Sequence, residues 1–314
     1  MLKVILIGYG YWGSKLARNF QNLEIFKLVS IVDTNRKNIH LAKKNYPLAK
    51  TYSNFKTAIK KNFADLIVIS TPTATHYKIA KFALENFNNV LVEKPLCLSL
   101  KNVKKLNQIA KKNKKMIFVD YPFLFSGTVS FIKKIINKKT YGKILEIESF
   151  REQAPVRNDV NVIWDLGAHD ISILSYLLKT QPYSINTIKK NNINSFICDS
   201  AYINLKYKNN LNVLIKNSWI SPTKIRKIKI KFRKAILYCD ENESLYKIKI
   251  YKKNSKKSST KYSLEVPEID LSEPLSKLAS YIAKSIKKNN NQLFMNNFNE
   301  RITYLLEKID KSDD

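Results

Sequence analysis

Glycine, proline, cysteine and histidine are all scarce in this sequence. The chain has 6 glycines, 9 prolines and 3 cysteines among 314 residues, and 44% of its residues are hydrophobic. This composition is typical of a folded protein rather than a disordered one. No apolar run approaches the length that spans a membrane, and the amino terminus lacks a basic stretch followed by an apolar stretch and a cleavage site. We therefore expect a cytoplasmic protein with no membrane partner.

The few cysteines argue against two kinds of site. Cys97, Cys198 and Cys239 are widely spaced, odd in number and form no C-x-x-C pair. Neither a disulfide framework nor a cysteine-rich metal site has such a pattern. We expect buried free thiols and no bound metal.

Acidic residues are also few, with 25 Asp and Glu against 56 Lys and Arg, so the formal net charge is +31. A strongly basic chain attracts nucleic acid or an anionic surface. Here the excess is almost all lysine, is spread along the whole chain and accompanies abundant Asn and Ile, as A/T-rich coding would produce. We expect no specific nucleic-acid partner, although a positive surface favours anionic substrates such as nucleotides.

The first part of the sequence alternates short β-branched runs with longer segments of helical apolar spacing. Strands buried on both faces are predicted at 3–7, 27–32, 65–70, 89–93 and 115–119, and helices at 12–23, 73–87 and 98–113. This alternation predicts a doubly wound parallel sheet of the Rossmann type over residues 1–120.

The pattern changes after Tyr121. Helices are predicted at 123–137 and 164–178, and several alternating runs between residues 200 and 253 follow with no helix between them. Such runs predict an open, mostly antiparallel sheet with one polar face, and two further helices are expected at 273–288 and 298–309. The fold class is therefore α/β, with a second α+β domain over residues 121–314. Residues 252–261 are predicted to form an exposed hairpin loop.

The stretch "KVILIGYGYWGSK" places Gly8, Gly10 and Gly13 between a strand and a helix, and Asp33 follows Gly13 by 20 residues at the end of the second strand. This context is the dinucleotide-binding pattern. The first glycine permits a tight turn, the second lets the backbone approach a pyrophosphate, and the third allows close helix packing. Asp33 predicts NAD rather than NADP, because its carboxylate binds ribose hydroxyls and repels a 2′-phosphate, while Arg36 offers a phosphate contact that softens this preference.

The glycines alone do not separate hydride transfer from methyl transfer. Further stretches discriminate, namely "STPTATHY" at 70–77, "VEKPL" at 92–96 and "NVIWDLGAHDISIL" at 161–174. Together they resemble the Gfo/Idh/MocA family, and the resemblance covers nearly the whole chain. It implies a nicotinamide-dependent enzyme that oxidises a sugar or polyol hydroxyl or reduces the ketone, with a second domain whose open sheet often mediates oligomers.

The resemblance also implies roles for particular residues. Lys94 would lie between cofactor and substrate, and Asp165 and His169 would face the substrate from the second domain. Imidazole suits proton transfer near neutral pH, so His169 is the candidate base, Asp165 would orient it or bind the same hydroxyl, and Lys94 would stabilise alkoxide charge. The candidate cofactor-binding residues are Gly8, Gly10, Tyr11, Trp12, Gly13, Asp33, Arg36, Thr71, Pro72, His76, Glu93 and Lys94, and the candidate substrate-binding residues are Lys94, Arg151, Asn161, Asp165 and His169.

Two departures from the family pattern leave the substrate open. Ala168 stands where relatives often have proline, and the segment 151–159, "REQAPVRND", is unfamiliar. A nucleotide-linked sugar on its way into a surface polysaccharide or modified glycan is the first expectation, and a free polyol, inositol or simple sugar is the second. The expected partners are this small molecule and further copies of the chain, as a homodimer or homotetramer through the second-domain sheet.

Other interpretations are possible for the same residues. His76 can be a packed helix-start residue, and Asp165 with His169 can be a structural pair. The Y-x-x-x-K pattern of short-chain dehydrogenases occurs at Tyr77/Lys81, but in so lysine-rich a chain it arises by chance. A non-catalytic NAD-binding sensor would be favoured by loss of Lys94 or His169, and both are present.

Overall fold

The computed structural model describes the whole chain except residues 194–195, 254–260, 290–292 and 313–314. By its internal contacts the chain divides into two compact units. The first comprises Met1–Pro122 and Glu273–Tyr304, and the second comprises Phe123–Ser272 and Leu305–Asp314. The division predicted at residue 120 differs from this grouping in the segment 273–304, which returns to the first unit.

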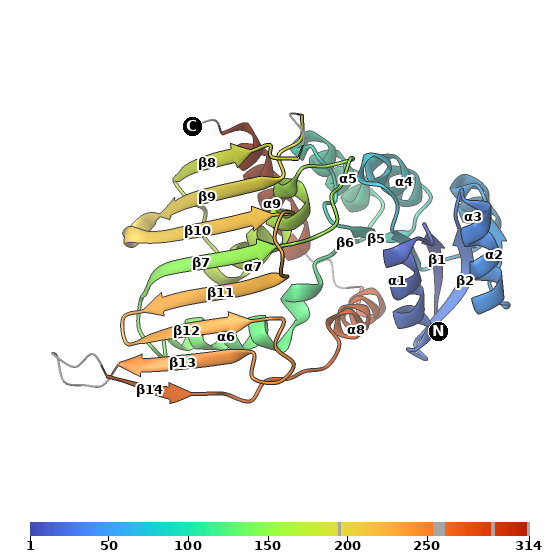
Figure 1. Cartoon of the computed structure of the whole chain (residues 1–314). Coiled ribbons are helices and arrows are strands. Elements are labelled where there is room, and N and C mark those ends of the chain that lie inside the picture. Colours follow the sequence, from blue (N-terminus) through green and yellow to red (C-terminus); the bar gives the residue numbers. More distant parts are fainter. Residues whose placement is uncertain (194–195, 254–260, 290–292, 313–314) are drawn as a thin grey trace. The chain divides into compact units, whose positions relative to one another are not determined.

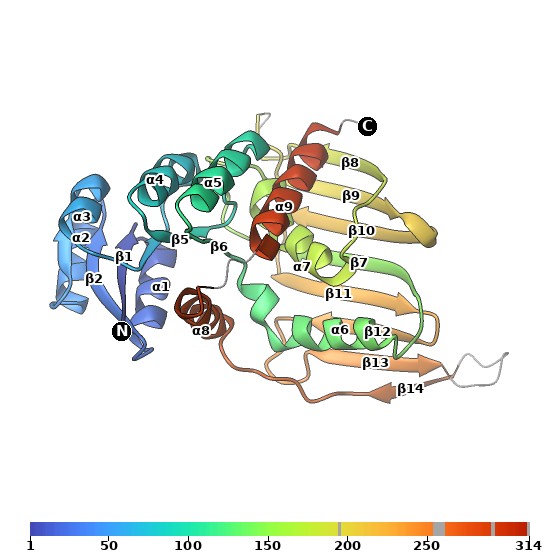
Figure 2. The ribbon, with the colours of Figure 1, turned by 180° about the vertical axis from the view of Figure 1, so that it is seen from behind.

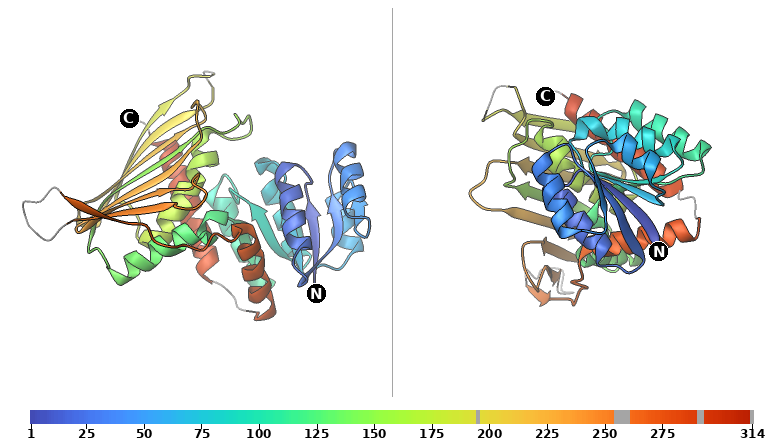
Figure 3. Two further views of the ribbon diagram at one scale, coloured as in Figure 1. Left: turned by 60° about the horizontal axis from the view of Figure 1, so that its bottom comes forward. Right: turned by 90° about the vertical axis from the view of Figure 1, so that its right-hand side faces the viewer.

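The first unit contains a six-stranded parallel sheet with the order β3-β2-β1-β4-β5-β6. Its strands are β1 (Leu2–Ile7), β2 (Phe26–Val32), β3 (Lys50–Tyr52), β4 (Leu66–Ile69), β5 (Asn89–Glu93) and β6 (Ile117–Asp120). The helices between them are α1 (Tyr11–Gln21), α2 (Arg36–Asn45), α3 (Phe55–Lys61), α4 (Thr73–Glu85) and α5 (Leu100–Lys112). Helices lie on both faces of this sheet (Figure 3). The predicted Rossmann fold is confirmed.

The parallel strands are buried on both faces because they are almost entirely aliphatic. All four residues of β4 are fully buried, as are Val4 and Ile5 of β1. The later helix α8 (Pro274–Lys287) packs against α1 of the same unit. There Arg18 Nη2 lies 2.9 Å from Glu273 Oε1, just before α8 begins.

The second unit contains an eight-stranded sheet with the order β14-β13-β12-β11-β7-β10-β9-β8 (Figure 1). Its strands are β7 (Ile144–Glu152), β8 (Ser184–Lys190), β9 (Ser200–Tyr207), β10 (Leu211–Ser218), β11 (Ile225–Phe232), β12 (Ala235–Asp240), β13 (Ile248–Lys253) and β14 (Tyr262–Glu265). β7 and β10 pair in parallel, and the other pairings are antiparallel. The mostly antiparallel sheet predicted from sequence is confirmed.

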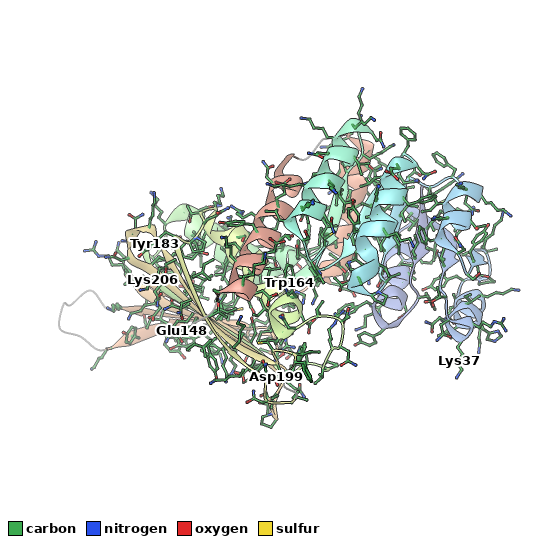
Figure 4. The ribbon with its side chains drawn as sticks, turned by 90° about the horizontal axis from the view of Figure 1, so that it is seen from above. Lys37, Glu148, Trp164, Tyr183, Asp199 and Lys206 are labelled. Carbon is green, nitrogen blue, oxygen red and sulfur yellow. The ribbon has the colours of Figure 1, made fainter. Side chains whose placement is uncertain are left out.

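One face of the large sheet is covered by α6 (Gly127–Lys138) and α7 (Ala168–Leu178), as Figure 2 shows. The inward side chains of β7 are Ile147, Ser149 and Arg151, all buried. The opposite face is polar and carries cross-strand ion pairs, such as Lys229 Nζ with Glu148 Oε1 at 2.7 Å. Glu148 of β7 and Lys206 of β9 are labelled in Figure 4.

Several elements differ from the predictions in their limits. The helix predicted at 164–178 begins as a π-helical turn over Ile163–Gly167, and a short 3₁₀ helix over Pro122–Phe125 precedes α6. Helix α9 runs from Leu293 to Lys311, and its last turns from Leu305 group with the second unit. Most of the hairpin loop predicted at 252–261 lies outside the described residues. In the part of the chain that the structure describes, every helix is too short or too polar to cross a membrane.

Candidate functional site

The glycine loop connects β1 to α1, and its three glycines meet different surroundings. Gly8 has φ +92°, and a Cβ there would lie 2.2 Å from the Ser70 carbonyl oxygen. A Cβ on Gly13 would lie 1.9 Å from the Gly8 carbonyl oxygen. At Gly10 a Cβ would meet nothing within 4 Å. Two of the glycines are therefore required by packing within the chain, whereas Gly10 borders open space beside the start of a helix.

Helix α1 begins at Tyr11 with Gly10 as its N-cap, and no side chain caps its first amides. Uncapped amides at a helix start carry partial positive charge and bind phosphate oxygens. The open space over Gly10 lets a pyrophosphate approach these amides closely. The loop thus fits the diphosphate of a dinucleotide.

Asp33 stands one residue after β2 and is held by hydrogen bonds from its own chain. Its Oδ2 accepts from Tyr9 N at 2.7 Å and Asn38 Nδ2 at 3.1 Å, and its Oδ1 accepts from Asn35 N at 2.8 Å. The Tyr9 bond ties the carboxylate to the glycine loop. Asp33 and the loop therefore form one unit that fits a ribose beside a pyrophosphate.

The other candidate residues near this loop are solvent-exposed. Arg36 lies at the start of α2, and the rings of Tyr11 and Trp12 pack edge to face with centroids 5.7 Å apart. Lys15 Nζ lies 4.0 Å from the Tyr11 ring centroid and 4.7 Å from that of Trp12. These aromatic side chains remain predicted cofactor contacts.

Thr71, Pro72 and His76 follow β4, at the carboxyl edge of the parallel sheet. Pro72 is exposed and precedes α4, and Thr71 Oγ1 lies 2.6 Å from Thr75 Oγ1. His76 is 1% exposed, with Nδ1 2.9 Å from the Pro95 carbonyl oxygen and Nε2 2.8 Å from the Thr71 carbonyl oxygen. The imidazole therefore joins the segments that follow β4 and β5. Its direct contact with a cofactor stays a prediction.

Glu93 is the last residue of β5, and Lys94 follows it before a cis peptide bond to Pro95. Lys94 is 9% exposed, which is unusual for lysine. Its backbone amide donates to Glu93 Oε2 at 3.2 Å. Lys94 thus lies at the carboxyl edge of the sheet, where open α/β sheets bind their ligands.

In the second unit, Asp165 lies in the π-helical turn before α7 and is buried. Trp219 Nε1 donates to its Oδ2 at 3.0 Å, and Arg157 Nη1 lies 3.5 Å from its Oδ1. Arg157 also contacts both carboxylate oxygens of Asp159, and this hydrogen bonding raises the pKa of Arg157. Asp165 therefore lies beside a fully charged guanidinium. π-helical turns often occur at functional sites.

His169 lies in the first turn of α7 and is half-buried. Its ring packs edge-on against Phe123, with centroids 5.1 Å apart and an interplanar angle of 83°. The guanidinium of Arg151 lies 4.6 Å from the centroid of the same Phe123 ring. The structure therefore brings His169 and Arg151 to one aromatic side chain, as sequence reasoning did not foresee.

Arg151 and Asn161 make interactions inside the second unit. Arg151 is 3% exposed, and its Nε lies 3.2 Å from Asp170 Oδ1. Asn161 Oδ1 accepts from the amides of Ile163 and Trp164, and its Nδ2 donates to Asp310 Oδ1 at 2.7 Å. Both side chains shape the surroundings of the π-helical turn. Their contact with substrate stays a prediction.

The sequence matches two family models in succession. Residues 2–121 match the oxidoreductase family with an NAD-binding Rossmann fold, and residues 129–238 match the GFO/IDH/MocA C-terminal domain. The chain belongs to the GFO/IDH/MocA family. Its first domain is the NAD-binding domain of that family, so the predicted family and cofactor are confirmed.

Named GFO/IDH/MocA relatives are distant. The chain is 24% identical over 184 residues to the myo-inositol 2-dehydrogenase of Thermotoga maritima, covering 56% of this chain and 55% of that enzyme. It is 23% identical over 172 residues to the 1-carboxy-3-chloro-3,4-dihydroxycyclohexa-1,5-diene dehydrogenase of Comamonas testosteroni, covering 51% and 43%. The match thus spans about half the length of these relatives.

One solved structure shares the fold over almost the whole chain. The UDP-N-acetylglucosamine 3-dehydrogenase of Acidithiobacillus ferrooxidans aligns with a TM-score of 0.84 and 16% identity, covering 98% of this chain and 96% of that one. At this identity the likeness concerns the fold alone.

Sequence reasoning missed several residues around the candidate site of this GFO/IDH/MocA protein. Trp219 and Arg157 contact Asp165. Asp170, which pairs with Arg151, also accepts hydrogen bonds from Ser149 Oγ at 2.8 Å and from Asn217 Nδ2 at 2.7 Å. The unfamiliar segment 151–159 was a signal for Arg157. Nothing in the sequence marks Trp219, which follows a strand and is distant along the chain.

Proposed function

We propose that this protein is a nicotinamide-dependent dehydrogenase or reductase that interconverts a hydroxyl and a ketone on a nucleotide-linked sugar. The observation that carries the proposal is the glycine loop, with open space over Gly10 and Asp33 tied to it through Tyr9. The solved UDP-N-acetylglucosamine 3-dehydrogenase of the same fold supports the substrate class. The net charge of +31 also suits a substrate that carries a diphosphate.

The chemistry of the proposed reaction requires a proton to leave or join the substrate oxygen. NAD, when bound, supplies the hydride acceptor or donor. We assign proton transfer to His169, since imidazole titrates near neutral pH. Asp165, held by Trp219 and Arg157, orients that ring or binds the same hydroxyl. A carboxylate fixed by two donors keeps its position while the proton moves.

Lys94 is assigned to the charge that develops on the substrate oxygen. Its ammonium stabilises an alkoxide in oxidation and polarises the carbonyl in reduction. Because Lys94 is 9% exposed, little water screens its charge. Such a charge contributes most in the transition state, where the oxygen is most negative.

The test combines a substrate panel with two substitutions. Nucleotide sugars, free sugars and free polyols are each supplied with NAD or NADH, and absorbance of the reduced nicotinamide is followed. His169→Ala is expected to lower kcat by about 10²- to 10⁴-fold with unchanged NAD affinity, and Lys94→Ala by at least as much. The matched controls are His40→Ala and Lys81→Ala, which change an exposed and a half-buried helix residue of the first unit.

Other results of the panel would replace the proposal. Turnover of a free polyol but of no nucleotide sugar would favour the second candidate, a polyol dehydrogenase, which the relative named myo-inositol 2-dehydrogenase supports. Tight NAD binding with no turnover would indicate a non-catalytic NAD sensor. Near-wild-type turnover in both His169→Ala and Lys94→Ala would show that the residue assignment is wrong.

We also propose a role and an assembly for the protein. A nucleotide-linked sugar modified in this way would serve the synthesis of a surface polysaccharide or glycan, and we expect the reaction in the cytoplasm. The assembly would be a homodimer or homotetramer through the uncovered face of the eight-stranded sheet. That face carries exposed Tyr202, Leu214 and Tyr238, on strands β9, β10 and β12.

A further inference from the structure

Two carboxyl side chains meet at the carboxyl edge of the parallel sheet in the first unit. Glu93 ends β5 and Asp120 ends β6, and the parallel register places these two residues opposite each other. Burial raises the pKa of Asp120, and the charge and hydrogen bonding of Glu93 raise it further. Asp120 is 2% exposed, so water cannot solvate its charge. A buried acid with another acid as its partner needs a specific explanation.

A hydrogen bond between two neighbouring carboxyl groups requires a proton. Ionised carboxylates are acceptors only, so one of the two must be protonated to donate. Glu93 Oε1 and Asp120 Oδ1 are buried and have no hydrogen-bond partner among the described residues. Two negative charges in this position would be both unsolvated and mutually repulsive. The geometry therefore favours one shared proton and one negative charge.

The negative charge of the pair lies next to Lys94. Glu93 Oε2 accepts from the Lys94 amide at 3.2 Å, and the Lys94 ammonium acts on Asp120 by its charge. One shared negative charge balances one ammonium. A second negative charge would pull the ammonium toward the pair and away from any substrate oxygen.

We propose that Asp120 is a positioning residue that shares one proton with Glu93 and thereby fixes the Glu93 carboxyl, which in turn fixes Lys94 at the sheet edge. The inference rests on the proposed function only in taking Lys94 as the group to be positioned. The shared proton itself does not depend on any substrate. Its existence and the catalytic role of Lys94 can therefore be tested separately.

The pair has a defined effect on stability. Burial raises the pKa of Asp120 well above its ordinary value, the charge and hydrogen bond of Glu93 raise it further, and Lys94 lowers it. An acid with a higher pKa in the folded chain keeps its proton longer there than in the unfolded chain. The folded state therefore loses stability as pH rises from about 4 to the raised pKa.

The first experiment measures urea unfolding of wild type and Asp120→Asn across this pH range. Asparagine keeps a donor for Glu93 but cannot ionise, so it mimics the protonated acid. The unfolding constant of wild type relative to Asp120→Asn should rise by up to about tenfold per pH unit. The control is Glu85→Gln, which removes an exposed ion-pair partner of Lys81 at 3.7 Å. The unfolding constant of wild type relative to Glu85→Gln should not change with pH. A flat ratio for Asp120→Asn as well would overturn the shared proton.

The second experiment tests positioning without a substrate. The rate at which an amine-reactive reagent acylates Lys94 is measured by peptide mass spectrometry. Asp120→Ala leaves Glu93 without its donor, so Lys94 should react several-fold faster, whereas Asp120→Asn should react at the wild-type rate. Equal rates in all three proteins would overturn the positioning role. If Lys94→Ala proves fully active on a substrate, the proposed function fails, and both of these measurements still report on the pair.

Discussion

Asp33 accepts three hydrogen bonds from its own chain, so its carboxylate is in place before any nucleotide arrives. A fixed negative charge there binds ribose hydroxyls and repels a 2′-phosphate. We predict that the wild-type protein binds NAD more tightly than NADP. Asp33→Asn keeps an oxygen acceptor for the Tyr9 amide and loses the charge. It should lower the ratio of the NADP Kd to the NAD Kd by about tenfold or more, as calorimetric titration can measure.

The matched control for this substitution is Asp65→Asn. Asp65, just before β4, also accepts a backbone amide, because its Oδ2 lies 2.7 Å from Lys3 N. Its substitution should leave both dissociation constants unchanged. Tighter binding of NADP than of NAD by the wild-type protein would contradict the prediction and would shift attention to Arg36.

Residues could be predicted where a local pattern marks them. The glycines and Asp33 stand at fixed spacing around a strand and a helix, so the sequence alone locates them. Asp120 also ends a buried strand, but its proposed role depends on Glu93. That residue precedes it by 27 positions in the sequence and lies opposite it in the neighbouring strand. Trp219 follows β10, and the course of that strand places its indole beside Asp165. Such contacts depend on tertiary folding, which no spacing rule reports.

Helix α1 packs on the end of β1 at a distance that requires glycine at position 13. A Cβ there would lie 1.9 Å from the Gly8 carbonyl oxygen, and backbone cannot move aside cheaply. We predict that Gly13→Ala lowers the free energy of unfolding by about 1 to 3 kcal/mol or more, as overpacked cores do. Thermal and urea unfolding of the variant against wild type measure this loss.

Gly10→Ala is the matched substitution with the opposite expectation. Its Cβ meets nothing within 4 Å and its φ of −79° suits alanine, so stability should stay unchanged or rise slightly. NAD affinity should fall, because the methyl group occupies the space through which a pyrophosphate approaches the helix amides. Loss of stability in Gly10→Ala, or unchanged NAD affinity, would contradict the assigned role of the loop.

Elements could be predicted where their apolar runs are long. The buried strands β1, β2, β4 and β5 are mostly aliphatic, and the sequence therefore predicts the parallel sheet. β3 has three residues and α3 has seven, too few for a period to be visible. The parallel pairing of β7 with β10 joins strands about 66 residues apart, and local alternation cannot specify such a partner. The π-helical turn at Asp165 leaves no mark in apolar spacing.

The assignment of segments to units depends on the whole chain. The change in strand and helix pattern predicts one division near residue 120, yet 273–304 groups with the first unit because α8 packs against α1 there. The apolar face of α8 could pack against any helix with a similar apolar face. The sequence of α8 therefore does not identify α1 as its partner.

The uncovered face of the eight-stranded sheet combines ion pairs with exposed apolar side chains. Lys227 and Lys229 pair with Asp240 and Glu148, so much of the charge on this face is balanced within the chain. Tyr202, Leu214 and Tyr238 are 46%, 40% and 44% exposed. A second copy could cover these side chains, and a stable interface buries about 1,600 Å² in total.

We predict that the wild-type protein is a dimer or tetramer at micromolar concentration and that Tyr202→Asp combined with Leu214→Glu makes it monomeric. Two new carboxylates would be buried against their own copies across a symmetric interface, where each would lack a partner. Light scattering coupled to size-exclusion chromatography gives the mass. The control is Leu48→Glu, which changes a side chain 92% exposed in the first unit and should leave the mass unchanged. A wild-type monomer, or a double variant of wild-type mass, would show that this face is not the contact between copies.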